Sequence, residues 1–389
     1  MTDQFRFFVT CPRGTEGALR RELVGMRIGS PKGDRGGVWF DGPLLMAMGV
    51  CLRARTAVRV LLRLAEFEVR DAHGLYAAAR AVDWRAWLTA RSTLAVDANV
   101  KDNPALTHSG FAALKVKDAV VDSLRDALGA RPDVDAKRPD VSIVLHVAGG
   151  QGALFLDLAG DPLHRRGYRV AMTEAPLKET LAAAVLALGG VAVDRPFVDP
   201  MAGGGTLAIE HALAARGLPP GLRRRFGFER WPTLDDALRA AWDETRAAVE
   251  AAAMAPRAPL PPIVCADVSP DALGAARRNA SAAGVDDDLT FELADVAALE
   301  RRWDAGTVCT NPPYGERLQP HDLDALYRDL GRALMRLPGW TAVVLSGSPL
   351  FARALPLRAA ISHRLFNGRI EVRLLRYEIP EAKPASGPR

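Results

Sequence analysis

The sequence is poor in the residue types that build metal centres. Only four cysteines occur in 389 residues, at positions 11, 51, 265 and 309, and no two of them have the spacing of metal ligands. The seven histidines are scattered as well. Cys265 and Cys309 fall inside apolar segments, where a free cysteine acts as a small core residue. The sequence therefore predicts that no metal is bound.

Long apolar segments are also missing. No run reaches the roughly 18 residues that a transmembrane helix needs, and the N-terminus lacks the pattern of a signal peptide. We therefore expect a cytoplasmic protein with no membrane partner. The sequence does not determine the oligomeric state.

Basic residues are in excess in only one half of the chain. The net charge is +5, and residues 1–169 contain 25 Lys and Arg against 19 Asp and Glu. Residues 170–389 contain 26 against 27. The N-terminal half is therefore the part in which we expect a polyanion to bind.

The length and the pattern of elements predict two or three domains. Residues 1–65 alternate strands and helices in the order β-α-β-α-β, which is typical of a small ferredoxin-like α+β unit. Residues 66–163 form a second unit around a long helical pattern, Ser109–Leu128. In residues 164–380, apolar strands that end in polar residues alternate with helices, which predicts an α/β domain. Residues 381–389 are predicted to be a disordered tail.

A glycine turn follows the apolar segment Pro196–Val198. The strand end and the turn comprise Asp199, Pro200, Met201, Ala202, Gly203, Gly204, Gly205 and Thr206. Glycines let the backbone approach a ligand, and the helix that follows presents free N–H groups. No lysine follows, which excludes a Walker A loop, and the glycine spacing does not fit a dinucleotide fingerprint. We expect a nucleotide-type cofactor against this turn.

Two further strands end in a carboxylate. Ile263–Asp267 is followed by Val268 and a helix, and Leu289–Asp295 is a similar unit. Asp267 is placed to accept both hydroxyls of a ribose, and Asp295 to accept the exocyclic amine of an adenine. Taken singly, each carboxylate is more often a helix cap or a loop charge.

The fourth strand end carries the run Asn311-Pro312-Pro313-Tyr314. Two consecutive prolines remove two N–H donors and fix φ, so the turn is stiff. The Asn311 oxygen and the Pro312 carbonyl can accept the two N–H bonds of an amino group on a planar ring, on which Tyr314 would stack. The alternative is a simple turn with a packed aromatic residue.

These four motifs, in this order, resemble those of class I S-adenosylmethionine-dependent methyltransferases. Leu163–Arg169, Ala175–Ala184, Phe226–Trp231 and Asn367–Ile370 extend the resemblance to the THUMP-domain RNA guanine-N2 methyltransferase family, over nearly the whole chain. The resemblance implies a Rossmann-like catalytic domain at 164–380, a THUMP domain at 66–163 and S-adenosylmethionine as cofactor. It also implies cofactor contacts from Pro176 and Leu177.

The family resemblance further implies that the product is N2-methylguanosine, most closely as in members that act on 23S ribosomal RNA. Asn311, Pro312, Pro313 and Tyr314 would then be the catalytic residues. The family usually has Cys-Gly-Ser-Gly-Thr where this chain has Ala202-Gly203-Gly204-Gly205-Thr206, so the strength of cofactor binding is in question. We expect the second methyltransferase that some relatives carry to be absent.

RNA contacts are predicted from basic residues in three places. A helix N-terminus with lysines, an arginine-rich link, and an insert that mixes arginines with Phe226, Phe228 and Trp231 all fit phosphate or single-strand binding. The residues are Lys115, Lys117, Arg165, Arg166, Arg169, Arg223, Arg224 and Arg225. The alternatives are solvated charges and an insert whose aromatics pack onto the domain.

Three other functions remain open from the sequence. A tRNA guanine-N2 methyltransferase would share the glycine turn and the Asn-Pro-Pro-Tyr run, which also serves DNA adenine-N6 and protein glutamine methyltransferases. A non-catalytic RNA-binding or ribosome-assembly protein with a methyltransferase fold is a second possibility, supported only by the altered glycine turn. An NAD oxidoreductase is a third.

Overall fold

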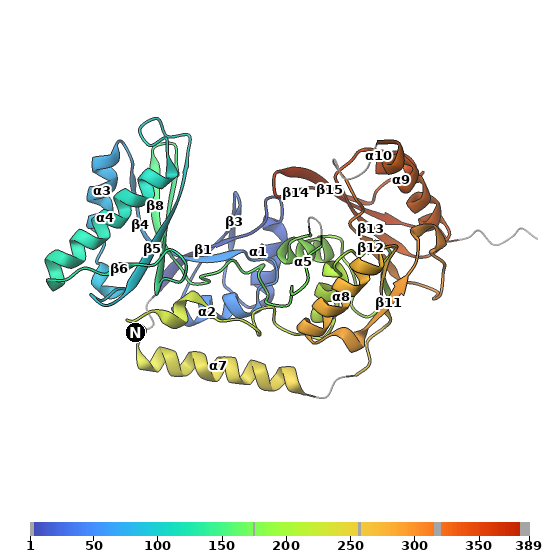
Figure 1. Ribbon diagram of the computed structural model, residues 1–389, viewed down its shortest axis with the longest axis horizontal. Helices are drawn as coiled ribbons and strands as arrows, with labels where there is room; N and C mark the ends of the chain where they lie inside the picture. The colour runs from blue at the N-terminus through green and yellow to red at the C-terminus, as the bar shows by residue number, and fades with distance from the viewer. Residues whose placement is uncertain (1–3, 174–175, 256–257, 315–319, 382–389) are drawn as a thin grey trace, which may run out of the picture. The chain divides into compact units, whose positions relative to one another are not determined.

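The computed structural model describes residues 4–173, 176–255, 258–314 and 320–381 (Figure 1). Ala175 of the Ala175–Ala184 segment and residues 382–389 of the predicted tail lie outside the described residues. The chain forms two compact units that are each discontinuous in sequence. The first comprises Met1–Thr10, Arg20–Leu163 and Arg224–Ala252, and the second comprises Cys11–Leu19, His164–Arg223 and Ala253–Arg389.

The first unit is built on an eight-stranded sheet with the order β2-β3-β1-β4-β8-β7-β5-β6. Its strands are β1 (Phe5–Thr10), β2 (Lys32–Asp34), β3 (Gly37–Gly42), β4 (Arg59–Glu68), β5 (Thr93–Lys101), β6 (Asp133–Val134), β7 (Val141–Ala148) and β8 (Gln151–Asp157). Its helices are α2 (Leu44–Arg53), α3 (Ala72–Arg80), η1 (Trp84–Ala86), α4 (Ser109–Leu128), η2 (Gly227–Arg230) and α7 (Asp236–Met254), while α1 (Glu16–Gly25) begins in the segment assigned to the second unit. In β7 alternate residues are buried, as the period of a half-buried strand requires.

The second unit contains a seven-stranded sheet with the order β11-β10-β9-β12-β13-β15-β14. Its strands are β9 (Phe197–Asp199), β10 (Ile263–Asp267), β11 (Leu289–Leu293), β12 (Thr307–Thr310), β13 (Thr341–Ser346), β14 (Ile361–Asn367) and β15 (Ile370–Glu378). β9 to β13 are parallel, and β15 and β14 continue the sheet as an antiparallel hairpin.

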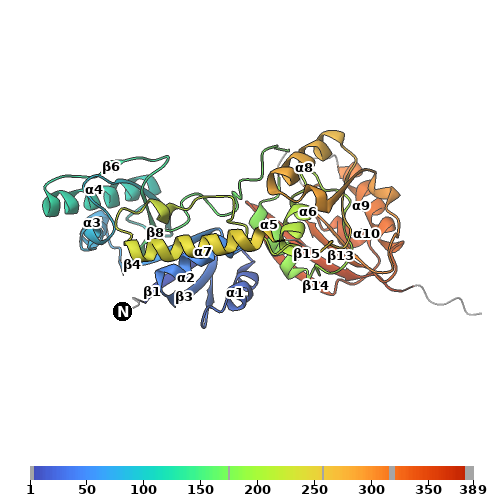
Figure 2. The ribbon, with the colours of Figure 1, turned by 90° about the horizontal axis from the view of Figure 1, so that it is seen from below.

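Helices cover both faces of this second sheet (Figure 2). They are α5 (Glu179–Leu188), α6 (Thr206–Ala215), α8 (Pro270–Ala283), η3 (Asp286–Asp288), η4 (Val296–Ala298), α9 (Pro320–Met335) and α10 (Leu350–Ala354). α5, α6 and α8 share one apolar core with the sheet, and α9 and α10 share the other. The predicted α/β fold class, with α+β units before it in sequence, is confirmed.

The strand order reverses direction between β9 and β12. From β9 the chain proceeds through β10 to β11 on one side, and then starts again with β12 on the other. In open α/β sheets, ligands bind beyond the carboxyl ends of the strands at such a switch point. This topology places Asp199, Asp267 and Asn311 together at the carboxyl ends of neighbouring strands.

The basic and aromatic insert packs into the first unit. Phe226 and Phe228 are fully buried and stack on each other at 5.5 Å, and Trp242 of α7 meets the Phe228 ring edge-on at 4.8 Å. The main chain adds hydrogen bonds, since Gly227 N–H donates to Ala159 and Phe228 N–H to Leu158. The prediction that these aromatics are offered to RNA is therefore wrong.

None of the helices in the described part of the chain is both long and apolar enough to cross a membrane.

Candidate functional site

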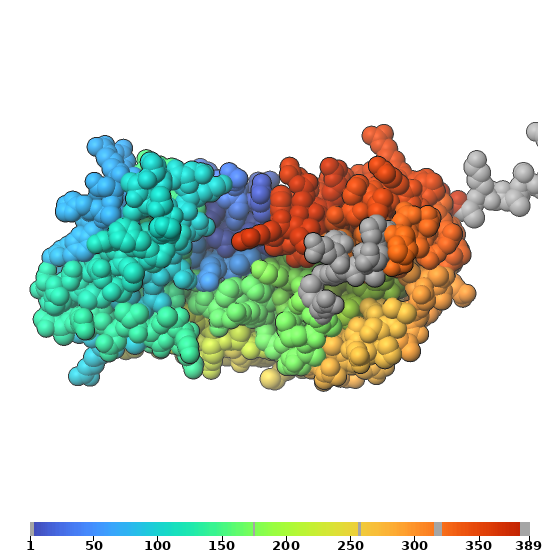
Figure 3. All heavy atoms as spheres, turned by 45° about the horizontal axis from the view of Figure 1, so that its top comes forward, coloured from blue at the N-terminus to red at the C-terminus, as the bar shows by residue number. Residues whose placement is uncertain are grey.

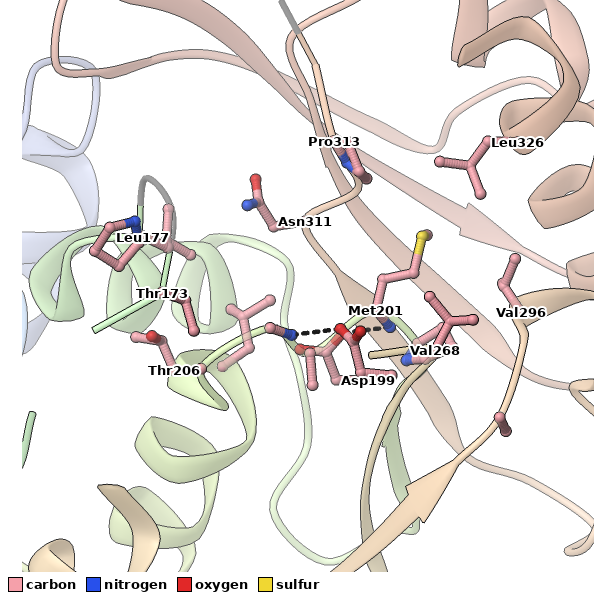
Figure 4. A pocket seen from close by; sticks show the side chains of 18 of the residues that line it. Thr173, Leu177, Asp199, Met201, Thr206, Val268, Val296, Asn311, Pro313 and Leu326 are labelled. Carbon is pink, nitrogen blue, oxygen red and sulfur yellow. Dashed lines mark hydrogen bonds between the residues drawn. The ribbon is translucent and has the colours of Figure 1, made fainter. Parts of the chain in front are cut away.

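A cavity of about 400 Å³ opens at the switch point of the second sheet (Figure 4). It is lined by Thr173, Pro176, Leu177, Asp199, Pro200, Met201, Ala202, Gly203, Gly204, Thr206, Leu207, Asp267, Val268, Ala294, Asp295, Val296, Asn311, Pro313 and Leu326. The fold thus brings together every predicted cofactor residue except Gly205. Thr173, Val296 and Leu326 carry no sequence signal that separates them from core or loop residues.

The glycine turn forms the floor of the cavity. Gly203 has φ +53°, and a β-carbon there would meet no atom within 4 Å, so its backbone faces open space. Gly205 has φ +78°, and a β-carbon there would lie 3.0 Å from the Ala276 side chain, so it serves helix packing instead. Gly204 takes the place of the serine usual in the resembling family. A β-carbon at Gly204 would lie 3.2 Å from the Thr173 hydroxyl.

Asp267 ties the glycine turn to the end of β10. One carboxylate oxygen accepts the Gly203 N–H at 2.8 Å, and the other accepts the Ser269 N–H at 2.9 Å. Each oxygen keeps a lone pair for a ligand. Asp295 is exposed and accepts the Ala297 N–H at 2.7 Å, which fixes its carboxylate at the rim of the cavity.

Asp199 is the most deeply buried carboxylate of the cavity. It is 1% exposed, and one oxygen accepts the Met201 N–H at 3.3 Å. Burial raises the pKa of Asp199 to about 7, and the negative charge of Asp267 adds to the rise. A cationic ligand group would restore the charged form of this carboxyl.

Asn311 follows β12 directly and projects into the cavity (Figure 4). Its side-chain oxygen is buried and has no hydrogen-bond partner among the described residues. Buried polar atoms are nearly always paired, so an unpaired acceptor facing a cavity indicates a donor supplied by a ligand. Pro313 lines the cavity, and its carbonyl accepts the Tyr327 hydroxyl at 2.8 Å.

Pro312 and Tyr314 do not line the cavity in this structure. Pro312 is buried, and Tyr314 is only 2% exposed. The Tyr314 hydroxyl accepts the Asn367 side-chain N–H at 2.7 Å, and the ring packs on Gly347, where a β-carbon would lie 2.6 Å away. The Tyr314 ring is used in packing in this arrangement, and its stacking on a bound ring stays a prediction.

Two polar residues hold the cavity wall, a role that the sequence does not predict for either of them. Asn279 of α8 is fully buried and accepts the Val170 and Ala171 N–H groups at 3.0 and 2.9 Å. Its amide donates to the carbonyls of Ala171 and Gly204, each at 3.1 Å. Asn279 thereby fastens the segment before the cavity to the glycine turn.

Arg169 is the second of these residues, and it is not placed as a phosphate ligand. Its guanidinium donates to Glu179 at 2.8 Å, to the Leu177 carbonyl at 2.8 Å and to the Thr206 hydroxyl at 3.1 Å. Because Leu177 and Thr206 line the cavity, Arg169 holds its wall. The prediction that Arg169 binds RNA is corrected accordingly.

Arg166 and Arg224 are also buried. Arg166 is 3% exposed and lies 3.5 Å from Glu210. Arg224 is 9% exposed and donates to the carbonyls of Asp161 and Pro162 at 2.5 and 2.9 Å. Neither can meet a phosphate in this structure, so both are withdrawn as RNA ligands.

The other predicted RNA residues reach the surface. Arg165, Arg223 and Arg225 are exposed, and Lys115 and Lys117 of α4 are partly exposed. Lys115 lies 5.6 Å from the ring centre of Phe111, and Lys117 pairs with Asp118 at 2.7 Å. Their RNA contacts remain predictions.

Three family models match the chain in consecutive segments. Residues 6–61 match the RlmL ferredoxin-like domain, residues 69–157 the THUMP domain, and residues 166–376 the RMKL-like methyltransferase domain. The last match covers more than half of the chain.

Similar proteins include ribosomal RNA large subunit methyltransferase K/L from Syntrophotalea carbinolica, 42% identical over 98% of this chain and 55% of that protein. The corresponding protein of Aeromonas hydrophila subsp. hydrophila is 40% identical, with the same coverage. The chain thus spans about half the length of these curated relatives.

Solved structures show the same architecture. The methyltransferase SMU.472 in complex with SAH is 27% identical, with a TM-score of 0.88 over 98% of this chain and 100% of that one. A methylase from Clostridium difficile 630 is 28% identical, with a TM-score of 0.88 over 100% of both chains. TrmN from Thermus thermophilus, at 24% identity and a TM-score of 0.71 over 97% of this chain and 100% of that one, shares the fold. The chain belongs to the RMKL-like methyltransferase-domain family, with a THUMP domain and an RlmL-type ferredoxin-like domain before the methyltransferase domain in sequence.

Proposed function

We propose that this protein is an S-adenosylmethionine-dependent RNA methyltransferase that forms N2-methylguanosine in 23S ribosomal RNA. The observation that carries the proposal is the unpaired, buried side-chain oxygen of Asn311 beside a cavity that also presents Asp199, Asp267 and Asp295. Family membership and the names of the curated relatives support the same reading.

The cavity fits an adenosine-type cofactor with a cationic end. Its volume of about 400 Å³ is in the usual range for small-molecule sites. Asp267 would accept the two ribose hydroxyls, and Asp295 the adenine amine. Asp199, buried below the glycine turn, would face the ammonium group of the methionyl part. Bound S-adenosylmethionine supplies an electrophilic methyl group.

Asn311 would hold the acceptor amine. The amino nitrogen of guanine is a weak nucleophile because its lone pair is delocalised into the ring. By accepting one N–H, the Asn311 oxygen would orient the nitrogen and raise its electron density as the carbon–nitrogen bond forms and the methyl–sulfur bond breaks. The methylated nitrogen would then lose its extra proton to water. The sequence predicts the Pro312 carbonyl as the second acceptor, but Pro313 and not Pro312 lines the cavity. The Pro313 carbonyl keeps a second lone pair beside its bond to Tyr327, so it would accept the other N–H instead. Orientation of this kind can provide much of a rate enhancement between two bound reactants.

The target nucleotide must be unpaired or flipped out, since the amino group is otherwise engaged in a base pair. An unpaired loop is most accessible before a ribosomal subunit is complete. We therefore expect naked or partly assembled 23S RNA to be a much better substrate than the mature subunit.

Transfer of a labelled methyl group from S-adenosylmethionine to a panel of RNAs tests this function. The panel contains naked 23S RNA, mature large subunits, 16S RNA and tRNA. The proposal predicts strong labelling of naked 23S RNA alone. Labelling of tRNA without 23S RNA would assign the chain to tRNA, and cofactor binding without any transfer would favour a non-catalytic RNA-binding role.

A further inference from the structure

We infer that the outer face of the β14–β15 hairpin binds single-stranded RNA flanking the modified nucleotide. This inference rests on the proposed function, because it names the surface that receives the substrate of the same site. The hairpin forms the edge of the sheet in the second unit, and Figure 3 shows the red C-terminal segment at the molecular surface.

The pairing of the two strands gathers arginines on one face. Arg364 lies directly opposite Arg373, and Phe366 lies opposite Glu371. Successive side chains of a strand point to opposite faces. Leu365, between Arg364 and Phe366, therefore points to the core, where it is fully buried. Two like charges directly opposite each other destabilise a hairpin. A bound anion would reduce the repulsion between Arg364 and Arg373, so their pairing indicates an anion-binding surface.

A second segment of the same unit adds another arginine. The Arg13 guanidinium lies 4.1 Å from the centre of the Phe366 ring, and that of Arg364 lies 5.6 Å from it. Gly14 makes this approach possible, because it has φ +89° and a β-carbon there would lie 2.4 Å from the Arg364 carbonyl oxygen. Arg13 is thus held over an aromatic ring while remaining exposed.

The charge of this face is mainly unneutralised. Glu371 pairs with Arg364 at 2.5 Å, and both side chains are largely exposed, so the pair is weak. Arg13, Arg369 and Arg373 are exposed and have no carboxylate partner among the residues that the structure describes. Guanidinium groups bind phosphates in a bidentate manner, and a flat guanidinium also stacks on an unpaired base.

The tip of the hairpin is joined to the catalytic turn. Asn367 donates to the Tyr314 hydroxyl at 2.7 Å, and Pro313, next to Tyr314, lines the cavity. Arg364 and Asn367 are three residues apart, about 10 Å along a strand. Asn367 shares the side of β14 that carries Leu365, so the arginine face lies on the other side of the strand. An RNA strand whose target base enters the cavity would pass around this tip to place its flanking nucleotides on that face.

The test compares full-length variants in RNA binding and in methyl transfer. Arg13→Ala, Arg373→Ala and Phe366→Leu each remove one component, and Arg195→Ala is the matched control. Arg195 is an exposed arginine just before β9, at the amino end of a central strand of the same sheet. Affinity for a single-stranded 23S fragment is measured by fluorescence anisotropy over a salt series, and that for S-adenosylmethionine by calorimetry.

We expect Arg13→Ala and Phe366→Leu to weaken RNA binding about tenfold, the loss typical of one stacked base. Each arginine removed should lower the salt slope by about 0.7. KM for RNA should rise while kcat, cofactor affinity and the control variant stay unchanged. If Phe366→Leu unfolds the protein, Arg13→Ala and Arg373→Ala still test the inference, because they alter exposed side chains.

Other outcomes distinguish a failure of the inference about the hairpin from a failure of the proposed function. Wild-type RNA affinity and salt slope in all three variants, with methyl transfer intact, would overturn the inference and leave the proposed function standing. Stronger binding of duplex than of single-stranded RNA would also overturn it. A wild-type protein that binds cofactor but neither binds nor methylates RNA would overturn the proposed function itself.

Discussion

Two segments of the methyltransferase region, Asn311–Tyr314 and Arg223–Trp231, both have compositions that suggest ligand binding, yet they have different surroundings. The Asn311 oxygen is buried beside a cavity and has no partner in the described chain. Phe226 and Phe228 are fully buried, and Arg224 donates to backbone carbonyls. The sheet determines where a polar residue at the end of a parallel strand lies. A mixture of arginines and aromatics can lie on the surface or in the core, and only its packing partners determine which.

Removing the Asn311 side chain should have the largest effect on function. Asn311→Ala is expected to lower the single-turnover rate of methyl transfer by about 10²–10³-fold or more, as loss of a preorganised hydrogen bond in an active site does. Cofactor affinity should stay nearly unchanged, because in the proposed mechanism Asn311 contacts the acceptor amine and not the adenosine. Asn311→Asp keeps an acceptor oxygen and should retain more of the rate. A wild-type rate in Asn311→Ala would exclude the amine contact.

Removing an aromatic ring of the second segment should affect stability instead. Phe228→Ala is expected to lower the free energy of unfolding by about 3–5 kcal/mol, because a buried ring is replaced by a cavity. The matched variant Arg225→Ala alters a side chain that is 75% exposed and should change it by less than about 0.5 kcal/mol. Denaturant unfolding measures both. Unchanged stability of Phe228→Ala together with lost RNA binding would restore the RNA interpretation.

Asp267→Ala should weaken S-adenosylmethionine binding by about 10- to 100-fold, since charge-assisted hydrogen bonds contribute about 1.5–3 kcal/mol each. Part of this loss comes from the glycine turn, because Gly203 N–H also loses its acceptor. Titration calorimetry gives the affinity, and circular dichroism checks the fold. Wild-type affinity in this variant would remove Asp267 from the site.

The smallest effect should come from pH. Burial raises the pKa of Asp199 to about 7, so its carboxyl is mainly neutral below that value and charged above it. A cationic cofactor prefers the charged form. Affinity should therefore fall several-fold, up to about tenfold, between about pH 8 and pH 6. Asp199→Asn should bind more weakly at high pH and lose this dependence. The same pH dependence in Asp199→Asn would assign the titration to another group.

Local sequence predicts the strand ends because each motif follows a short apolar strand, and parallel topology then gathers them at one edge. Residues that depend on distant partners are not predictable in this way. Asn279 binds Gly204 and Ala171 from a helix far along the chain, and no local pattern reports those contacts. The sequence likewise predicts one continuous domain at 164–380, whereas Arg224–Ala252 groups with the first unit. Phe228 contacts Trp242 only in the folded chain, because the two residues belong to different elements.

Nucleoside mass spectrometry of size-separated RNA from a strain lacking this chain tests whether the protein forms N2-methylguanosine in 23S RNA. We expect N2-methylguanosine to decrease in 23S RNA and to stay unchanged in tRNA. Re-expression of the wild-type chain should restore the modified nucleoside, and Asn311→Ala should not. Loss of N2-methylguanosine from tRNA with 23S RNA unchanged, or loss of a methylated adenosine instead, would contradict this expectation.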